Sequence, residues 1–423
     1  MPDCVVSSLG SSAHEPRLEL GINRSVFLAE LANLARDQDL FILSPYTCDA
    51  YSVVSDTMDS PVSRSSRKST RRKTNVKVVT YNILSSSLSS PGYFKNSKPE
   101  CCDPTNRMEK ILGKLNEEID DQAIICLQEV SHSFAGDLHT HFSQNDYYFI
   151  HALYGNKFNG YMGVGIAIPQ AKFDIEEIDI TKIGDTKRAP RKKTPTFLQS
   201  VYSYIMGIVE FFLRLVNAWK DKEDPWKSAL WKHNQMLCLR LTLKKGKTND
   251  TRSFVVGTYH MPCAFRTPEV MNIHCALSAQ HIQKFAKGDP FVFCGDFNIK
   301  PDSSMYEMMT CGSIDKDHPE YPKPLEGDES GWTPVVKPVL HSAYKQFNGS
   351  EPDFTNLSIV NDDPVFIDTL DYIFLSADTE DFCQWETTSV ESLPHRSEIV
   401  EPSFPTETEP SDHLLLSATL VLL

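Results

Sequence analysis

Polar side chains of the kinds that bind metal ions and move protons stand at five places where a predicted strand ends. They are Asn82 in TYNIL, Glu129 in ICLQEV, His260 in SFVVGTYH, Asp296 and Asn298 in FCGDFN, and Asp412 and His413 in PSDHLLL. Glutamate and aspartate offer hard oxygen ligands that suit Mg²⁺, and the other groups could supply acid, base and orientation. Strand ends meet at the rim of a sheet, so loops there can direct several side chains to one spot.

Each of these residues has a simpler explanation when it is taken alone. The Gly-Asp-Phe-Asn run at residues 295–298 resembles an ordinary turn, since Asp and Asn side chains bond to nearby backbone. The chemical interpretation therefore depends on the whole set, which falls at strand ends in a chain whose strands are otherwise apolar.

The elements that must position these groups alternate from Val76 onward. Strand patterns cover residues 76–82, 123–127, 163–168, 235–243, 253–259 and 290–295. Helical spacing recurs at Met108, Ile111, Leu112, Leu115 and Ile119. A second helix is predicted at about residues 269–287. This many strands, with helices between them, suit sheets packed face to face and covered by helices.

One predicted helix, at residues 197–219, interrupts this alternation. It follows a basic cluster formed by Lys187, Arg188, Arg191, Lys192 and Lys193. Polar and charged residues interrupt its apolar run, which argues against a membrane-spanning helix. We expect an amphipathic helix packed on the domain, with an interfacial membrane helix as the alternative.

Residues 1–75 form a predicted appendage. They hold one short amphipathic helix candidate, with Val26, Leu28, Leu31 and Leu34, and a Ser-rich basic tract at residues 63–73. We interpret the tract as a flexible linker, and the alternatives are a nuclear address or a phosphorylatable arm.

The composition of the 423 residues limits the partner and the compartment. The formal charge of −14 works against simple affinity for nucleic acid, so a polyanionic substrate must be held by a local patch or through metal. The eleven cysteines are scattered, and Cys126 and Cys294 lie in apolar runs, as buried thiols do in a reducing compartment. Residues 1–20 lack the pattern of a secretion signal. We therefore expect an intracellular protein, cytoplasmic or nuclear.

Five motifs in this order, TYNIL, LQEV, GDFN, LDYIF and SDH, resemble those of the endonuclease/exonuclease/phosphatase superfamily from about Thr80 to the C-terminus. Residues 348–358 and 368–374 resemble the branch of the carbon-catabolite-repressor deadenylases, Nocturnin, Angel and the 2′-5′ phosphodiesterases. The resemblance implies an α/β (α+β) four-layer sandwich, in which helices flank two central, mainly antiparallel sheets. It also implies a catalytic domain at residues 76–423, with a helical insertion at about residues 185–232.

The same resemblance implies a metal centre. Glu129 would be the principal ligand of Mg²⁺, for which Mn²⁺ could substitute. Asn82 and Asp412 would ligate the metal or orient its shell. Asp296 and Asn298 would position and deprotonate the attacking water.

Further roles concern the phosphate and the rest of the substrate. His413 would lie against the phosphorus opposite the leaving group, held by Asp371, and His260 would bind a phosphate oxygen. Substrate-binding roles are implied for Asn234, Asn356 and Phe354. The ring of Phe354 would stack on a nucleobase, and the alternative is a core residue under the strand that begins near residue 365.

Two departures from the branch bear on partners and substrate. Residues 1–75 have no counterpart of the leucine-rich repeats through which deadenylases dock to a larger complex, so such docking is not expected. After His260, the run HMPCAFRTP has no proline at the offset of the one that helps to hold a base, which leaves adenine preference open.

We therefore expect a Mg²⁺-dependent phosphoester hydrolase in which metal-assisted water attacks phosphorus. The first candidate is a 3′ exoribonuclease or phosphodiesterase of the deadenylase type, acting on RNA or a nucleotide. The alternative is a small-molecule phosphatase for an NADP-like dinucleotide or a sugar, inositol or lipid phosphate. Peripheral membrane contact through residues 197–219 and a non-enzymatic binding module on the same fold are further alternatives.

Overall fold

The computed structural model describes residues 75–187, 224–244, 252–379, 382–400 and 402–423, together with residues 202, 204 and 206. The chain divides into two units, Met1–Ser69 and Thr70–Leu423, and all described residues belong to the second. The basic tract at residues 63–73 and the rest of the appendage before residue 75 lie outside the described residues. So does the predicted helix at residues 197–219, apart from residues 202, 204 and 206, which are helical.

A six-stranded sheet has the order β14-β15-β1-β2-β4-β3. Its strands are β1 (Asn75–Asn82), β2 (Ile124–Val130), β3 (Tyr147–Leu153), β4 (Gly163–Pro169), β14 (Trp385–Val390) and β15 (Leu416–Leu422). Only β1 and β2 run parallel among these neighbours. Successive side chains of β1 point to opposite faces, so Val76 and Val78 pack between the sheets while Val79 and Tyr81 pack on the outer side.

A second sheet, of seven strands, packs face to face with the first. Its order is β13-β12-β8-β7-β6-β5, with β9 paired to β12. The strands are β5 (Phe173–Lys182), β6 (Gln235–Leu243), β7 (Ser253–His260), β8 (Phe291–Asp296), β9 (Leu340–Ser342), β12 (Asp371–Thr379) and β13 (Phe382–Cys383). β7 and β8 form its parallel pair. Two short strands, β10 (Asn356–Ser358) and β11 (Phe366–Asp368), pair separately.

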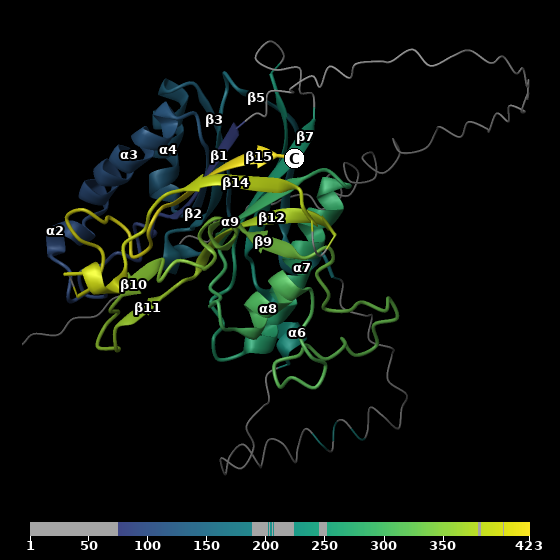
Figure 1. Ribbon diagram of the computed structural model, residues 1–423. Coiled ribbons are helices and arrows are strands. Elements are labelled where there is room, and N and C mark those ends of the chain that lie inside the picture. Colours follow the sequence, from purple (N-terminus) through teal and green to yellow (C-terminus); the bar gives the residue numbers. More distant parts are fainter. Residues whose placement is uncertain are drawn as a thin grey trace, which may run out of the picture. The chain divides into compact units, whose positions relative to one another are not determined.

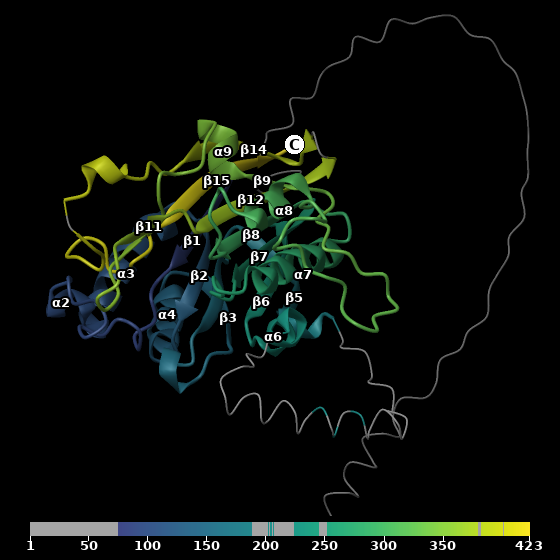
Figure 2. The same cartoon turned by 90° about the horizontal axis from the view of Figure 1, so that it is seen from below.

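Helices cover the outer face of each sheet, as Figures 1 and 2 show. α3 (Pro104–Asp120) and α4 (His132–Gln144) pack on the six-stranded sheet. α6 (Pro225–Trp231), α7 (Pro268–Ala286) and α8 (Ser304–Cys311) pack on the seven-stranded sheet. Short helices α2 (Pro99–Cys102) and α9 (Ala343–Asn348) and the 3₁₀ turns η1 (Lys157–Asn159), η2 (Ile183–Asp185) and η3 (Arg396–Glu398) complete the described elements. The predicted four-layer sandwich is confirmed.

The helix α3 shows how local sequence produces this arrangement. The side chain of Asp103 caps its N-terminus by accepting hydrogen bonds from the N–H groups of Thr105 and Asn106, each at 3.0 Å. Pro104 occupies the first position, where no intrahelical donor is needed. The predicted apolar stripe of this helix is buried against β1 and β2.

Two further expectations can be compared with the described residues. Cys126 and Cys294 are fully buried between the two sheets, as predicted. Each helix in the described part of the chain is too short or too polar to cross a bilayer.

Candidate active site

Strand pairing brings the predicted polar residues to one rim of the two sheets. In the six-stranded sheet, parallel β1 and β2 place Asn82 beside Gln128, next to Glu129. In the seven-stranded sheet, His260 at the end of β7 and Asp371 at the start of β12 both pair with Asp296 at the end of β8. The sheets thus contribute different groups to a common site.

The backbone of Glu129 is turned out of its strand by an irregularity. The register between β2 and β4 shifts between Gln128 and Val130, and Glu129 has a φ of 58°. For a residue of this size such a conformation costs about 1–3 kcal/mol, which the surrounding structure must support. The carboxylate of Glu129 is held by the N–H of Ser85 at 2.8 Å and by the amide of Asn82 at 3.4 Å. The bulge therefore directs a buried carboxylate into the site.

The amide of Asn82 links the two sheets. Its Nδ2 donates to Oδ2 of Asp296 at 2.9 Å as well as to Glu129, while its Oδ1 accepts the N–H of Leu84 at 3.0 Å. The family resemblance implies that Asn82 either ligates the metal or orients its shell. Because the nitrogen of Asn82 faces the carboxylates, the orienting role suits it better.

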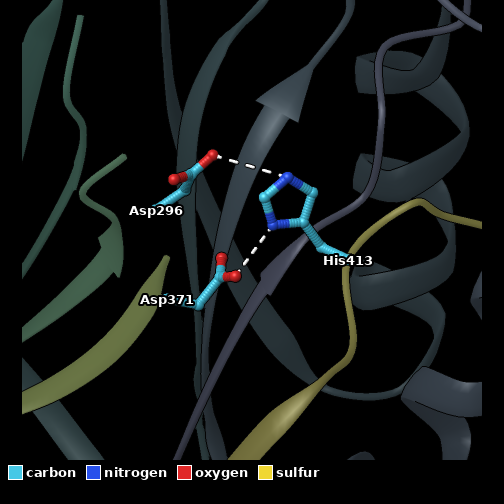
Figure 3. Close-up of side chains that lie close together, drawn as sticks. All are labelled: Asp296, Asp371 and His413. Atoms are coloured by element: carbon cyan, nitrogen blue, oxygen red, sulfur yellow. Dashed lines mark hydrogen bonds and ion pairs between the residues drawn. The ribbon is translucent and has the colours of Figure 1, made fainter. Parts of the chain in front are cut away.

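His413 forms the most tightly buried ion pair of the site (Figure 3). Its Nδ1 lies 2.8 Å from Oδ2 of Asp371, and its Nε2 lies 3.7 Å from Oδ2 of Asp296. Burial raises the pKa of Asp371 to about 6, against the pull of the neighbouring imidazole. Burial alone would lower the pKa of His413, but the surrounding carboxylates outweigh it and hold that pKa well above its usual range. The pair is therefore an imidazolium against a carboxylate at neutral pH.

The Asp371 carboxylate has a second anchor that the sequence did not reveal. Oγ1 of Thr355 donates to Oδ2 of Asp371 at 2.6 Å and accepts the N–H of Asp371 at 3.1 Å. Asn356, the next residue, pairs across a bridge with His413, and its Nδ2 lies 3.4 Å from Oδ2 of Asp412. Thr355 and Asn356 thus contact Asp371 and Asp412, two of the three acidic neighbours of His413.

Asp296 presents one oxygen and keeps the other occupied. Oδ1 accepts the N–H of Asn298 at 2.9 Å, and Asn298 adopts a φ of 53° while its side chain donates to Met261 O at 3.0 Å. Oδ2 faces Asn82 and lies 3.5 Å from Nε2 of His260. A side chain at Gly295 would place its Cβ 1.9 Å from Tyr259 O, so β7 and β8 can meet this closely only with glycine there.

Arg107 supports the site from behind and was missed from the sequence. Its fully buried guanidinium donates to the carbonyl oxygens of Ile83, Leu84 and Pro410. These carbonyls flank Asn82 on one side and Asp412 on the other. The available signal was a charged residue within the apolar stripe of α3, because long cations are rarely fully buried without dedicated partners.

A cleft of about 700 Å³ opens over these groups. Its lining includes seven of the predicted residues besides Asn234, namely Glu129, His260, Asp296, Asn298, Asn356, Asp412 and His413. Asn82 and Asp371 are not among the described residues that line the cleft, but they hydrogen-bond to residues that do. Asn234 donates to His260 O at 2.8 Å, so it also fixes the end of β7.

Phe354 was expected to stack on a substrate base, but its position makes it a core residue, as the alternative had it. Its side chain is fully buried and packs with Leu357, Phe404 and Leu414, away from the cleft lining. Five other aromatic residues line the cleft, namely Tyr93, Phe94, Phe158, Phe265 and Phe366, and of these only Phe94 is buried. The sequence could not separate these rings, because burial depends on how β10 and the loop before β15 pack together.

The donor atoms present fit a hard divalent cation. Asp296, Asp371 and His413 offer atoms within 4.8 Å of one another, but a protonated imidazole has no lone pair for a metal. The carboxylates of Glu129, Asp412 and Asp296 line the same cleft and offer the oxygen donors that such a cation prefers. Among the described residues Glu129 is only 9% exposed and forms no ion pair with a lysine or arginine. A bound cation would supply the missing charge.

Residues 79–413 match the endonuclease/exonuclease/phosphatase family, and the chain belongs to it. It is 27% identical over 187 residues to mouse 2′,5′-phosphodiesterase 12, which covers 43% of this chain and 28% of that protein. It is 25% identical over 367 residues to the Aspergillus niger CCR4-Not complex 3′-5′-exoribonuclease subunit Ccr4, covering 81% of this chain and 51% of the relative. The chain thus spans about half or less of the curated relatives it matches.

Solved structures show the same fold. The structure of ANGEL2, described as a 2′,3′-cyclic phosphatase, matches with a TM-score of 0.60 at 19% identity, covering 83% of this chain and 96% of that chain. The human Nocturnin catalytic domain matches with a TM-score of 0.51 at 18% identity, covering 84% and 96%. The predicted resemblance to this branch is confirmed.

Proposed function

We propose that this protein is a metal-dependent hydrolase of phosphate esters, with RNA or a nucleotide as substrate and Mg²⁺ as cofactor. The observation that supports it most is the position of Asp296, whose Oδ2 faces the amide of Asn82 and the imidazoles of His260 and His413. A carboxylate placed between hydrogen-bond donors at the floor of a cleft can accept a proton from water beside a bound phosphate.

Glu129 and Asp412 would hold the cation, and Asn82 would orient Glu129. When bound, Mg²⁺ would neutralise charge on the phosphoryl oxygens. Mn²⁺ has the same preference for oxygen ligands and is expected to substitute.

The protein's own groups would act on water and on phosphate. Asp296 is fixed through Oδ1 by Asn298, which leaves Oδ2 to orient and deprotonate the attacking water. His413, kept cationic by Asp371, would donate a hydrogen bond to a phosphoryl oxygen where negative charge increases in the transition state. His260 would bind a second phosphoryl oxygen through its Nε2.

The substrate class follows from relatives and from the cleft. The curated relatives include a 3′-5′-exoribonuclease subunit and a 2′,5′-phosphodiesterase. We therefore favour a 3′ exoribonuclease or phosphodiesterase of the deadenylase type. In this proposal Phe366 takes the base-stacking role that Phe354 cannot fill, since Phe366 lines the cleft and Lys300 Nζ lies 5.2 Å from the centre of its ring.

A small-molecule phosphatase is the second candidate. A cleft of about 700 Å³ falls within the range that encloses a single small ligand, such as a dinucleotide. A cytoplasmic or nuclear location remains part of the proposal, and the nine described cysteines, all free thiols, support it. Membrane contact through residues 197–219 stays a prediction.

A substrate panel with Mg²⁺ tests the proposal. Oligoadenylate, mixed RNA, 2′-5′ oligoadenylate, NADP⁺ and inositol phosphates would be offered to the wild-type protein and to Asp296→Asn. Hydrolysis of an RNA or nucleotide that the variant loses supports the proposal. Hydrolysis of inositol phosphates alone would contradict the substrate class, and equal rates in both proteins would contradict the assigned base.

A further inference from the structure

Two sets of residues line the cleft besides the predicted catalytic groups, and we call them its two walls. One wall combines residues 84–94 with the segment around β10 and β11; Leu84, Phe94 and Val360 pack together there, and Asn361 N–H donates to Tyr93 O at 2.7 Å. The other wall comes from the β3–β4 turn, the residues after α6 and the loop after β7. The proposed base-stacking residue Phe366 belongs to the first wall. The proposed function therefore assigns no part of the substrate to the second wall.

Three side chains of the second wall have properties that point to a ligand. Phe158 and Phe265 line the cleft with 72% and 49% of their surface exposed. Lys232 lines it as well and is half-buried, and its ammonium group makes no hydrogen bond or ion pair to any described residue. Large exposed rings beside an unpaired ammonium group are suited to a planar base and an anion.

The position of Lys232 is fixed by its neighbours. Its own N–H donates to Ala229 O at 3.2 Å and so ends α6, and Ile183 N–H donates to Asn234 O two residues later. Cys263, two residues before Phe265, lines the same cleft as Lys232. Lys232 and the loop that carries Phe265 therefore face the same cleft.

We propose that Lys232, Phe158 and Phe265 form a second substrate subsite, which binds the phosphate and base of the nucleotide next to the hydrolysed phosphodiester. The inference rests on the proposed function, because it assigns a ligand to the same cleft. A second phosphate is the shared chemistry of an oligonucleotide and of a phosphorylated dinucleotide. It follows that a substrate with one phosphate uses only part of the cleft.

A charge-neutral substrate analogue tests the role of Lys232. The pair is triadenylate and the same trimer with a methylphosphonate at the linkage next to the one that is cleaved. Wild type should prefer the charged trimer by about tenfold in kcat/KM, as expected for one charge-assisted contact. Lys232→Met should abolish that preference and leave the rate on the neutral trimer unchanged, whereas Lys232→Arg should retain it.

Lys227→Met is the matched control, since Lys227 is exposed on α6 outside the cleft lining and the variant loses the same charge. It should keep the full preference. A Lys232→Met protein that still prefers the charged trimer tenfold would overturn the subsite, as would a wild type without preference. Comparing kcat/KM for NADP⁺ and NAD⁺ distinguishes the two sources of the phosphate. A preference for NADP⁺ that Lys232→Met removes indicates a phosphorylated dinucleotide, and equal values indicate an oligonucleotide.

The rings are tested with a trimer that lacks the neighbouring base. Phe158→Ala and Phe265→Ala should each raise KM for the intact trimer about fivefold or more but not for the abasic trimer. Phe347→Ala, an exposed ring on α9 outside the cleft, serves as the control. Equal effects on both trimers would refute the stacking.

A binding measurement separates this inference from the proposed function. If wild type hydrolyses neither trimer, the proposed function fails, and the dissociation constants of the two trimers with Mg²⁺ then decide the subsite. A tenfold difference that Lys232→Met removes would support it, and equal constants in both proteins would refute it.

Discussion

The Nδ1 atom of His413 lies 2.8 Å from Oδ2 of Asp371, and the pair is buried behind the carboxylate of Asp296. A second His–Asp pair, His395 with Asp353 at 3.2 Å, lies on the surface outside the cleft lining. The two pairs share their chemistry and differ in position, which makes one a control for the other.

The buried pair is expected to matter for turnover. His413→Ala should lower kcat by about 10²–10⁴-fold, because it removes a cationic donor at the proposed transition state. Asp371→Asn should lower kcat less, by about 10–100-fold, since it only weakens the hold on the imidazole. Steady-state kinetics on the substrate found by the panel measure both, with Asp353→Asn as the silent control. Similar small losses in all three variants would mean that the buried pair is structural.

Removal of metal is expected to abolish activity reversibly. EDTA should stop hydrolysis, and Mg²⁺ or Mn²⁺ should restore it, because the proposed ligands are carboxylate oxygens. Glu129→Ala should be inactive while it keeps the circular dichroism spectrum of the wild type, and Glu117→Ala on the exposed face of α3 should be unaffected. Normal turnover by Glu129→Ala would show that the cation is held elsewhere.

Phe354 and Phe366 are expected to have opposite effects. Phe354→Ala should lower the free energy of unfolding by about 3–5 kcal/mol and leave KM unchanged, because its ring is fully buried among apolar residues. Phe366→Ala should raise KM for a nucleotide about tenfold with little change in Tm, as expected for the loss of one stacking contact. Urea unfolding and kinetics on both variants are sufficient. The reverse pattern would restore the base-stacking role to Phe354.

Arg107 is expected to couple stability to metal affinity. Arg107→Met leaves three buried carbonyl oxygens without their donor and should cost more than about 3 kcal/mol of unfolding free energy. Because those carbonyls flank Asn82 and Asp412, the Mg²⁺ concentration for half-maximal activity should rise as well. Lys110→Met on the same helix is the control. Loss of stability with unchanged Mg²⁺ dependence would limit Arg107 to a structural role.

The strand ends were predictable because the polar residues there break apolar runs. Asn82, His260 and Asp296 each occupy the last position of their strand, as the patterns indicated. Glu129 was found for the same reason, although its bulge and left-handed backbone depend on pairing with β4 and leave no local pattern. The strand and helix periods thus indicated packed sheets covered by helices, and the motifs indicated the family, whose resemblance implied the four-layer sandwich.

The residues that were missed depend on contacts between distant segments. Thr355 looks like an ordinary loop residue until β10 places it against Asp371. Lys232, which belongs to the proposed second subsite, is one of many lysines in the sequence, and only its position in the cleft lining distinguishes it. Phe354 shows the converse, since a motif can place an aromatic residue at a familiar position while local packing turns its ring into the core.

Asn82 on the six-stranded sheet bonds to Asp296 on the seven-stranded sheet, so the site is assembled across the seam between two separately hydrogen-bonded layers. A small slide of one layer over the other would break this 2.9 Å contact while each sheet kept its own ladder intact. Heating should therefore inactivate the protein before it loses secondary structure. Activity would then report how well the two sheets are aligned. Substitutions that tighten the packing between the sheets should make the activity more resistant to heat without changing any group in the cleft.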